Sequence, residues 1–263
     1  AERLNMTQST ISQQLARLEE AVGRGLIDRV ARPVRATASG ERLLGYARRI
    51  LTLQQEAETM LGDSAGTASI RIGVPDDIVT GTMARVFADF TRQHREVRLD
   101  VVAGLSRELT RRYRAGEFDI AVVKEPSASA DHRASYPEAM AWFESADAPE
   151  AWPEPLPLVT FPPGGLYRDA MFERIERERH RWYIALSSSN LYNVIVAVEA
   201  GLGLSLLPIG TTIGRGVRPY APFGMEPAMV ISIYSWEKGG LIAELVTAMS
   251  AVLAQRYSIP GQS

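Results

Sequence analysis

The chain has 263 residues, of which 46% are hydrophobic and 23% charged, and this predicts a folded globular protein with one small and one larger domain. It has no cysteine, which excludes disulfides and thiolate metal sites, and its three histidines lie too far apart for metal-ligand spacing, so we expect neither a metal nor a cofactor. The net charge of −2 gives no overall sign of a nucleic-acid partner, and the lack of both a run of about 18 apolar residues and a recognisable signal peptide favours a cytoplasmic protein without membrane contact.

The first predicted helix begins after Thr7, which is a good N-cap residue. Apolar residues follow at helical spacing from Ile11 to Leu18, and Gly23 ends the helix. The next stretch, residues 26–36, is short, irregular and rich in arginine. Its length and composition predict a two-stranded wing.

Residues 1–36 are therefore predicted to form a winged helix-turn-helix domain, truncated at its N-terminus because residues 1–4 look like the end of an earlier helix. Seven arginines lie between Arg24 and Arg49 against two acidic residues, a local basic charge that is typical of DNA binders. Hydroxyl and amide side chains at a helix N-terminus can approach base edges, and wing arginines can reach phosphates. The alternative is a polar helix face that only meets water. The candidate DNA-binding residues are Thr7, Gln8, Ser9, Thr10, Ser12, Gln13, Arg17, Arg29, Arg32 and Arg35.

A second, long helix is predicted from Thr37, its N-cap, to about Leu61. An exposed helix of this length must bury its apolar stripe against a partner, and a second copy of the chain is the natural one. Residues 37–62 are thus predicted to be a linker helix that forms a homodimer, followed by a hinge of small residues at 62–67. The stripe consists of Leu43, Leu44, Ala47, Ile50, Leu51, Ala57 and Leu61.

From residue 68 onward, strand and helix signals alternate. Strands at 69–74, 97–103 and 118–123 are separated by helices, and this order predicts a parallel sheet with helices on both faces. Residues 125–157 are harder to interpret, with a strand piece near 142–144 and a loop at 149–157.

A second α/β half is predicted next, and a closing helix at 242–255 ends the chain. Two such halves in series describe a two-subdomain sensor domain like that of periplasmic binding proteins, spanning residues 68–263. Its first half is placed at about 68–124 and 237–263, and its second at about 158–236. The second half contains strands at 158–161, 182–186, 204–207 and 228–236 and helices at 167–179 and 191–200.

Domains of this kind bind ligands in the cleft between the halves, at strand C-termini and helix N-termini. Each candidate there has a structural alternative, since aspartates and serines also cap helices and Lys124 can pair with Glu125 on the surface. The candidate effector-binding residues are Asp76, Asp77, Ser106, Lys124, Phe161, Ser187, Ser188 and Ser189.

The run TQSTISQQLARLE at residues 7–19 resembles the recognition helix of LysR-type transcriptional regulators. The likeness continues through Gly23, Arg24 and Leu26 to the start of the linker helix, with small departures such as Gly25 in place of proline. Only about the first 50 residues carry motifs of this specificity, although the order of parts fits over the whole chain. The resemblance implies a bacterial regulator that binds a pseudo-palindromic DNA site as a dimer or tetramer, under control of a small-molecule effector and with possible contact to RNA polymerase.

Two other functions are less consistent with the sequence. An enzyme is not expected, because no nucleophile elbow, phosphate-binding loop or paired histidine and carboxylate motif is present. A solute-binding protein with no DNA role would leave residues 1–62 unexplained. A DNA-binding regulator that has no effector ligand remains open as an alternative.

Overall fold

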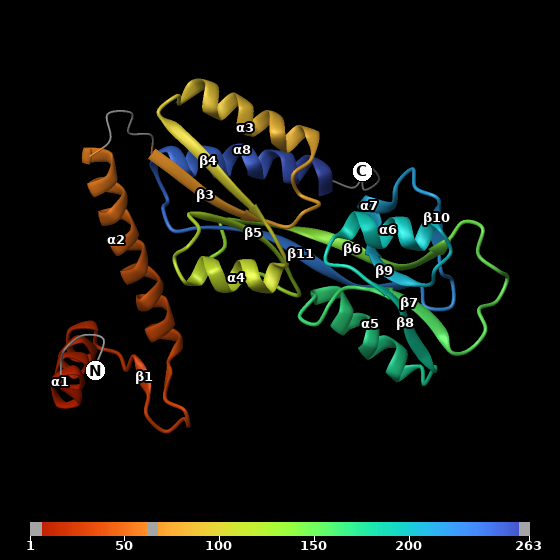
Figure 1. The fold of residues 1–263 in the computed structure, drawn as a ribbon, viewed down its shortest axis with the longest axis horizontal. Helices are drawn as coiled ribbons and strands as arrows, with labels where there is room; N and C mark the ends of the chain where they lie inside the picture. The colour runs from red at the N-terminus through yellow and green to blue at the C-terminus, as the bar shows by residue number, and fades with distance from the viewer. Residues whose placement is uncertain (1–6, 63–67, 258–263) are drawn as a thin grey trace.

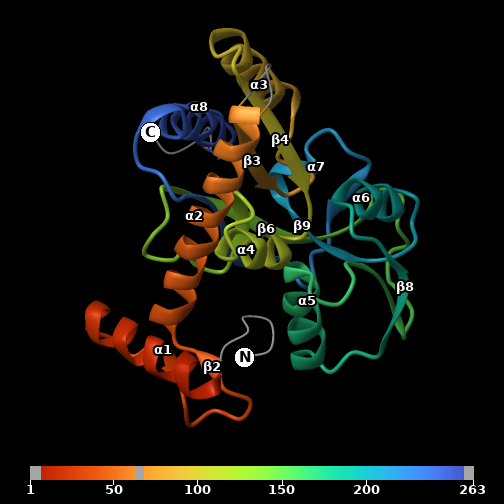
Figure 2. The same cartoon turned by 60° about the vertical axis from the view of Figure 1, so that its left-hand side comes forward.

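The computed structural model describes residues 7–62 and 68–257 (Figure 1). A small N-terminal unit contains helix α1 (Gln8–Val22) and the strands β1 (Ile27–Asp28) and β2 (Arg35–Ala36). The long helix α2 (Ala38–Gly62) leads from this unit to a larger α/β body, passing beside its helix α4 (Figure 2). Within the described ranges, no helix is both long enough and apolar enough to cross a membrane.

The ends of both N-terminal helices agree with the sequence predictions. The Thr7 hydroxyl accepts a hydrogen bond from the backbone N–H of Thr10, and Gly23 adopts the left-handed conformation (φ 68°) that glycine tolerates best. Thr37 caps α2 by accepting from the N–H of Gly40. A side chain at Gly40 would overlap the carbonyl oxygen of Leu26, so glycine allows α2 to pass directly beneath the wing.

One mixed sheet runs through the body with the strand order β10-β6-β11-β5-β3-β4, and its β11-β5-β3-β4 part builds the first lobe. Strands β3 and β4 are parallel, as are β3 and β5, in agreement with the predicted βαβαβ order. Helices α3 and α8 cover one face and α4 covers the other (Figure 1). The bounds are β3 Ala68–Val74, α3 Gly81–Gln93, β4 Val97–Ala103, α4 Ser106–Arg114, β5 Ile120–Glu125 and α8 Gly240–Tyr257.

Strand β5 shows why the sheet is buried on both faces. Its side chains alternate, so that Ile120 and Val122 join the core beneath α3 and α8, whereas Ala121 and Val123 join the core beneath α4. All four are buried, which accounts for the continuous apolar run in the sequence.

The second lobe has its own core around Trp142, which is fully buried. Its parallel strands β7 and β8 form a short separate sheet, and β9 and β10 both pair with β6. The bounds are β7 Leu156–Thr160, α5 Leu166–Arg177, β8 Trp182–Ser187, α6 Leu191–Glu199, β9 Ser205–Pro208, α7 Ile209–Thr212 and β10 Val217–Pro219.

Two long antiparallel strands, β6 (Ala134–Ser145) and β11 (Met225–Ser235), run through both lobes. The expected strand piece at 142–144 was too short, because Pro137 and the many small residues before it hide the strand in the sequence. The expectation that all of residues 228–236 belongs to the second half was also wrong, since residues 230–235 pair with β5 of the first lobe.

Candidate functional site

The N-terminal turn of α1 presents polar side chains to solvent. Gln8, Ser9, Ser12 and Gln13 are exposed, while Thr10 is half-buried. The Thr7 hydroxyl lies 2.9 Å from that of Ser9 and 2.7 Å from that of Thr10, so these three candidates form one local cluster. Arg17 is exposed two turns further along the helix.

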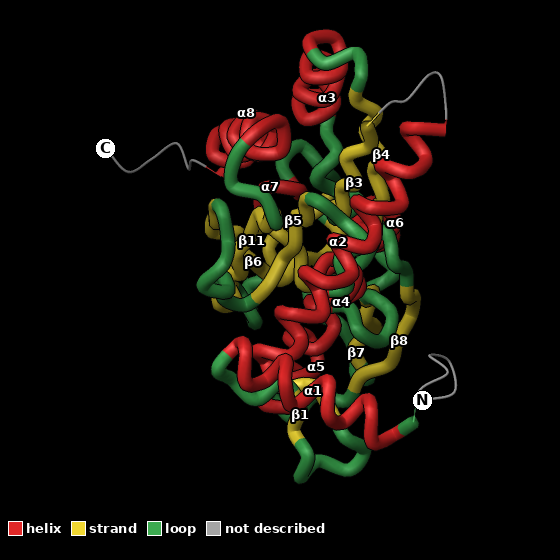
Figure 3. Tube along the Cα trace, turned by 90° about the vertical axis from the view of Figure 1, so that its left-hand side faces the viewer, coloured by secondary structure: helices red, strands yellow, loops and turns green. Residues whose placement is uncertain are grey.

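The wing and α1 lie together, at the far end of the molecule from α3 and α8 (Figure 3). Glu19 of α1 joins them, because its carboxylate accepts from the N–H groups of Leu26 and Ile27 at 2.8 and 3.2 Å. It also accepts from Arg29 at 3.0 Å, so that this guanidinium is held on the protein. These bonds, that of Leu26 above all, hold the pKa of the Glu19 carboxyl below its ordinary value. Arg32 and Arg35 are exposed on the wing.

A small cleft separates the two lobes, and six of the eight candidate effector residues meet in it: Asp76, Asp77, Ser106, Lys124, Phe161 and Ser189. The other two, Ser187 and Ser188, do not line it; Ser188 instead accepts a bond from the N–H of Asn190. The cavity volume is about 40 Å³, which has room for roughly three water molecules.

Lys124 lies buried at the base of the cleft between two carboxylates. Its ammonium is 2.8 Å from Asp77 and 3.1 Å from Glu138. Burial alone would lower the pKa of Lys124, but these two carboxylates outweigh it and raise the pKa. The alternative surface pair with Glu125 is wrong, because that carboxylate accepts from the hydroxyl of Tyr234 instead.

Asp76 reaches across the cleft to the N-terminus of α6 in the second lobe. One carboxylate oxygen accepts from Asn190 Nδ2 at 2.6 Å and from the N–H of Leu191 at 3.0 Å. The alternative that this aspartate caps the helix following it is therefore wrong; α3 begins after Thr80, and no side chain caps it. Desolvation raises the pKa of Asp76, and the bond from Leu191 opposes that shift only in part.

Ser106 and Arg107, at the start of α4, make further contacts near the cleft, one within the first lobe and one between the lobes. The Ser106 hydroxyl accepts from the N–H of Lys124 at 2.9 Å, so it fastens α4 to β5 and does not cap its own helix. Arg107 of α4 donates to Asp169 of α5 at 2.5 Å.

Across the ranges that the structure describes, no group of three histidine, aspartate or glutamate side chains is placed to hold a metal ion.

Sequence reasoning missed Glu138 and Tyr167. The Tyr167 hydroxyl donates to Glu138 at 3.0 Å, and both side chains are buried beside Lys124. Glu138 falls in the segment where β6 was not foreseen, so nothing in the sequence placed it near the cleft. Tyr167 begins a correctly predicted helix, and its position after a Gly-Gly turn was the available signal.

The comparisons with known proteins match both parts of the chain. Residues 1–41 match the family model described as bacterial regulatory helix-turn-helix protein, lysR family, and residues 64–227 match the LysR substrate binding domain. The chain is 31% identical over 79% of its length to the HTH-type transcriptional regulator DgdR of Burkholderia cepacia, of which it spans 70%. It is 29% identical over 76% of its length to the regulator PecT of Dickeya dadantii, of which it spans 63%.

Solved structures share the fold at low sequence identity. Full-length LysG of Corynebacterium glutamicum, with bound effector arginine, superposes with a TM-score of 0.60 at 19% identity, covering 96% of this chain and 90% of that one. The effector binding domain of QuiR in complex with shikimate gives 0.52 at 10% identity, covering 73% of this chain and 99% of that one.

Proposed function

This chain belongs to the LysR family of bacterial helix-turn-helix regulatory proteins, and from that premise we propose how it recognises DNA and how a small molecule controls it. The observation that carries the DNA role is the exposed polar turn at the start of α1, with an arginine-bearing wing fastened beside it through Glu19. A helix N-terminus of this kind enters the major groove, and the wing contacts the adjacent backbone.

Within that interface the ten candidates have different roles. Gln8, Ser9, Ser12 and Gln13 face the bases, and Arg17, Arg32 and Arg35 contact phosphates. Thr7 and Thr10 cap and order the helix start, and Arg29 holds the wing against Glu19 while it stays 61% exposed toward DNA.

The cleft between the lobes is proposed as the effector site. Its 40 Å³ is far too small for a metabolite such as arginine or shikimate, the ligands named for the two structural neighbours. A ligand of that size requires the lobes to part, and the contacts of Asp76 with α6 and of Arg107 with Asp169 must then break. Because Lys124 already holds two carboxylates, it positions the wall of the cleft and does not serve as an open cation for the ligand.

Exposed apolar side chains of α2 support a homodimer, with Leu44 42%, Ile50 64% and Leu51 59% exposed. Two paired linker helices would present two α1 helices to a pseudo-palindromic site about one or more helical turns apart. We further propose a homotetramer formed through the sensor domains, action in the cytoplasm, and contact with RNA polymerase. No catalytic step is proposed for the cleft.

Salt dependence tests the DNA role. The double variant R32A/R35A removes two phosphate contacts, so the slope of log affinity against log salt should fall by about 1.8, at about 0.9 per contact. The measurement is fluorescence anisotropy with a duplex that the wild-type protein selects from a random library. The control R95A/R181A loses the same charge from exposed arginines of the sensor body and should keep the wild-type slope. An unchanged slope in R32A/R35A would remove the wing from the interface.

A thermal-shift screen tests the effector role. The panel contains amino acids and hydroxylated carboxylic acids, the chemistries of the two neighbours' ligands. A compound at 100 times its Kd should stabilise the sensor domain by about 2.7 kcal/mol. The control S189W fills the cleft from an exposed lining position and should lose the shift. If no compound in a broad panel acts, the regulator without an effector becomes the better proposal.

A further inference from the structure

The linker helix is held against its own sensor domain at a second point, well before the two are joined along the chain. We propose that Arg49 of α2 and Asp119 of the first lobe are positioning residues, which fix the direction of the linker helix. They thereby fix the position of α1 and the wing, which we call the DNA reader, relative to the cleft. The DNA consequence rests on the function proposed above, whereas the placement of the helix does not.

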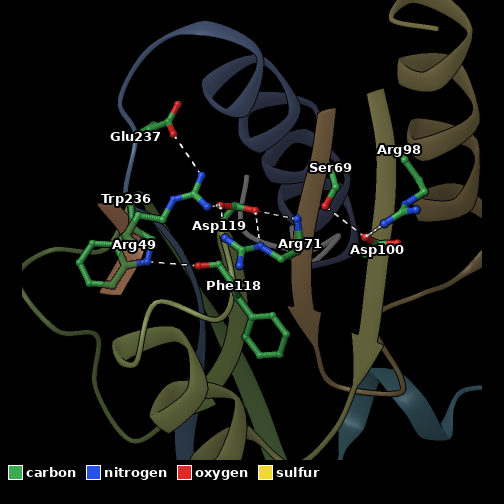
Figure 4. A network of polar contacts seen from close by, with 9 residues as sticks. All are labelled: Arg49, Ser69, Arg71, Arg98, Asp100, Phe118, Asp119, Trp236 and Glu237. Atoms are coloured by element: carbon green, nitrogen blue, oxygen red, sulfur yellow. Dashed lines mark hydrogen bonds and ion pairs between the residues drawn. The ribbon is translucent and has the colours of Figure 1, made fainter. Parts of the chain in front are cut away.

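The contact is an ion pair buried from solvent. Arg49 Nη1 lies against Asp119 Oδ1, with the two side chains 8% and 0% exposed (Figure 4). Asp119 also accepts from the backbone N–H of Arg71 at 2.7 Å and from its guanidinium at 3.2 Å, and Glu237 lies 3.4 Å from Arg49. A carboxylate with no exposure is stable only when it is paired, so Asp119 needs its arginines. An arginine on an exposed linker helix has no comparable need to be buried, which marks Arg49 as a docking residue.

The backbones at this point approach too closely for side chains. A Cβ at Gly45 would lie 2.6 Å from the carbonyl oxygen of Arg114 and 2.7 Å from the ring of Trp236. A Cβ at Gly116 would lie 3.0 Å from the carbonyl oxygen of Gly45. The helix is therefore seated directly on the chain that follows α4, one turn from Arg49.

Aromatic rings complete the contact. Tyr46 packs edge-on against Trp236, with ring centroids 4.8 Å apart, and Tyr113 of α4 stacks on the same indole at the same distance. The indole N–H of Trp236 donates to the carbonyl oxygen of Phe118 at 3.1 Å, next to Asp119 (Figure 4). We call Gly45, Tyr46, Arg49, Asp119 and Trp236 the linker clamp.

The linker clamp sits at the ends of the elements that build the cleft. Asp119 immediately precedes β5, which carries Lys124, and Trp236 immediately follows β11, which pairs with β5. The clamp is 13 residues before the end of α2 at Gly62, which is about 20 Å of helix. Two attachments that far apart set the direction of the helix, which a single attachment at its end would leave undetermined.

Distance measurement between spin labels tests the placement, and the absence of native cysteine makes labelling simple. Labels at Glu20→Cys on α1 and Gln93→Cys on α3, both exposed, report the position of the DNA reader, with excess unlabelled protein suppressing signals between subunits. We expect one narrow distribution in the parent protein and a distribution at least twice as wide in R49M. The variant G45A should broaden it too, although alanine favours helix more than glycine does, because its methyl group pushes α2 off the sensor body.

The control R42M removes an exposed arginine from the same helix and should leave the distribution narrow. R49K keeps the charge and should restore most of the narrow component. If R49M and G45A both stay as narrow as the parent, or if R42M broadens equally, the linker clamp does not position the helix.

DNA binding tests the functional consequence of the linker clamp. The two probes are a duplex selected by the parent protein and a duplex carrying only one of its half-sites. R49M should lose about tenfold affinity for the first duplex and keep its affinity for the second. The reason is that the variant disturbs only the joint placement of two DNA readers. Equal loss on both duplexes would indicate damage to the reader itself and would overturn the positioning role. If the parent protein binds neither duplex, the proposed function fails, and the spin-label distances still decide the placement.

Discussion

Lys124 is the residue on which the base of the cleft depends. Its side chain is 5% exposed, between carboxylates that are 11% and 1% exposed, so its removal leaves two negative charges in a buried site. We expect K124M to lower the free energy of unfolding by about 3–5 kcal/mol. Urea denaturation followed by circular dichroism measures the loss. The triple variant D77N/K124M/E138Q removes both orphaned charges and should recover much of it; equal stability of the two variants would contradict this account.

The raised pKa of Asp76 predicts how the stability of the fold depends on pH. Its folded-state pKa is raised above the ordinary 3.8 by desolvation, so the folded chain binds a proton more readily than the unfolded chain between pH 3.8 and the raised value. The contribution of Asp76 therefore favours folding at the acidic end of that window and is lost as pH rises through the folded pKa. D76N should remove this dependence, seen as a smaller fall in stability from pH 4 upward in parallel urea titrations. Identical pH profiles for the two proteins would exclude the effect.

At the scale of elements, α2 has one face on the sensor body and an exposed face that is proposed to form the dimer. Arg49 faces the sensor body, while Ile50 and Leu51 are more than half exposed beside it. A charge at Ile50 should therefore weaken the dimer and leave the subunit folded. We expect I50D to shift the mass measured by light scattering toward the monomer at micromolar concentration. The control I213D alters another exposed apolar residue (80%), which lies in the second lobe. If I50D leaves the measured mass the same as I213D does, another surface makes the dimer.

Elements whose ends depend on nearby residues could be predicted from the sequence. Thr7, Gly23 and Thr37 act within three or four positions of themselves, and the bounds of α1 and the start of α2 follow from them. Strand β6 could not be predicted in the same way. It carries a proline and no β-branched residue, and what makes it a strand is its pairing with β11, about 90 residues later.

The candidate site shows the same difference between features that depend on nearby residues and features that depend on distant ones. The rule that ligands bind at strand and helix ends brought six effector candidates to one cleft without knowledge of any contact. The partners of those residues were not predictable, because Asp76 bonds to a helix 115 positions away and Lys124 pairs with a residue on the unrecognised β6. The ion pair of Arg49 with Asp119 was not predicted for the same reason, since a sequence does not show which arginine of a basic segment is buried.

At the scale of the whole molecule, β6 and β11 are the two strands that cross between the lobes, so any movement of one lobe relative to the other must bend them. Their pairing is regular from Met229 onward but shifts register between Glu226 and Met229. That irregularity is where a bend disturbs the fewest hydrogen bonds. Hydrogen exchange should therefore be faster at Met229 than at Ile231, and D76A, which removes a contact between the lobes, should accelerate it further at Met229 alone. Equal acceleration at both sites would place the bend elsewhere.

The path of β6 and β11 also bears on how such a molecule can change its specificity over time. The chain leaves the first lobe on β6 and returns on β11 with Ala141 directly opposite Met225, so the whole second lobe is an insertion whose two ends are neighbours about 5 Å apart. Recombination can exchange, enlarge or shorten such an insertion without changing the chain path of the first lobe, the linker helix or the DNA reader. One wall of the cleft can thus be replaced while the other wall, and everything attached to it, is inherited intact.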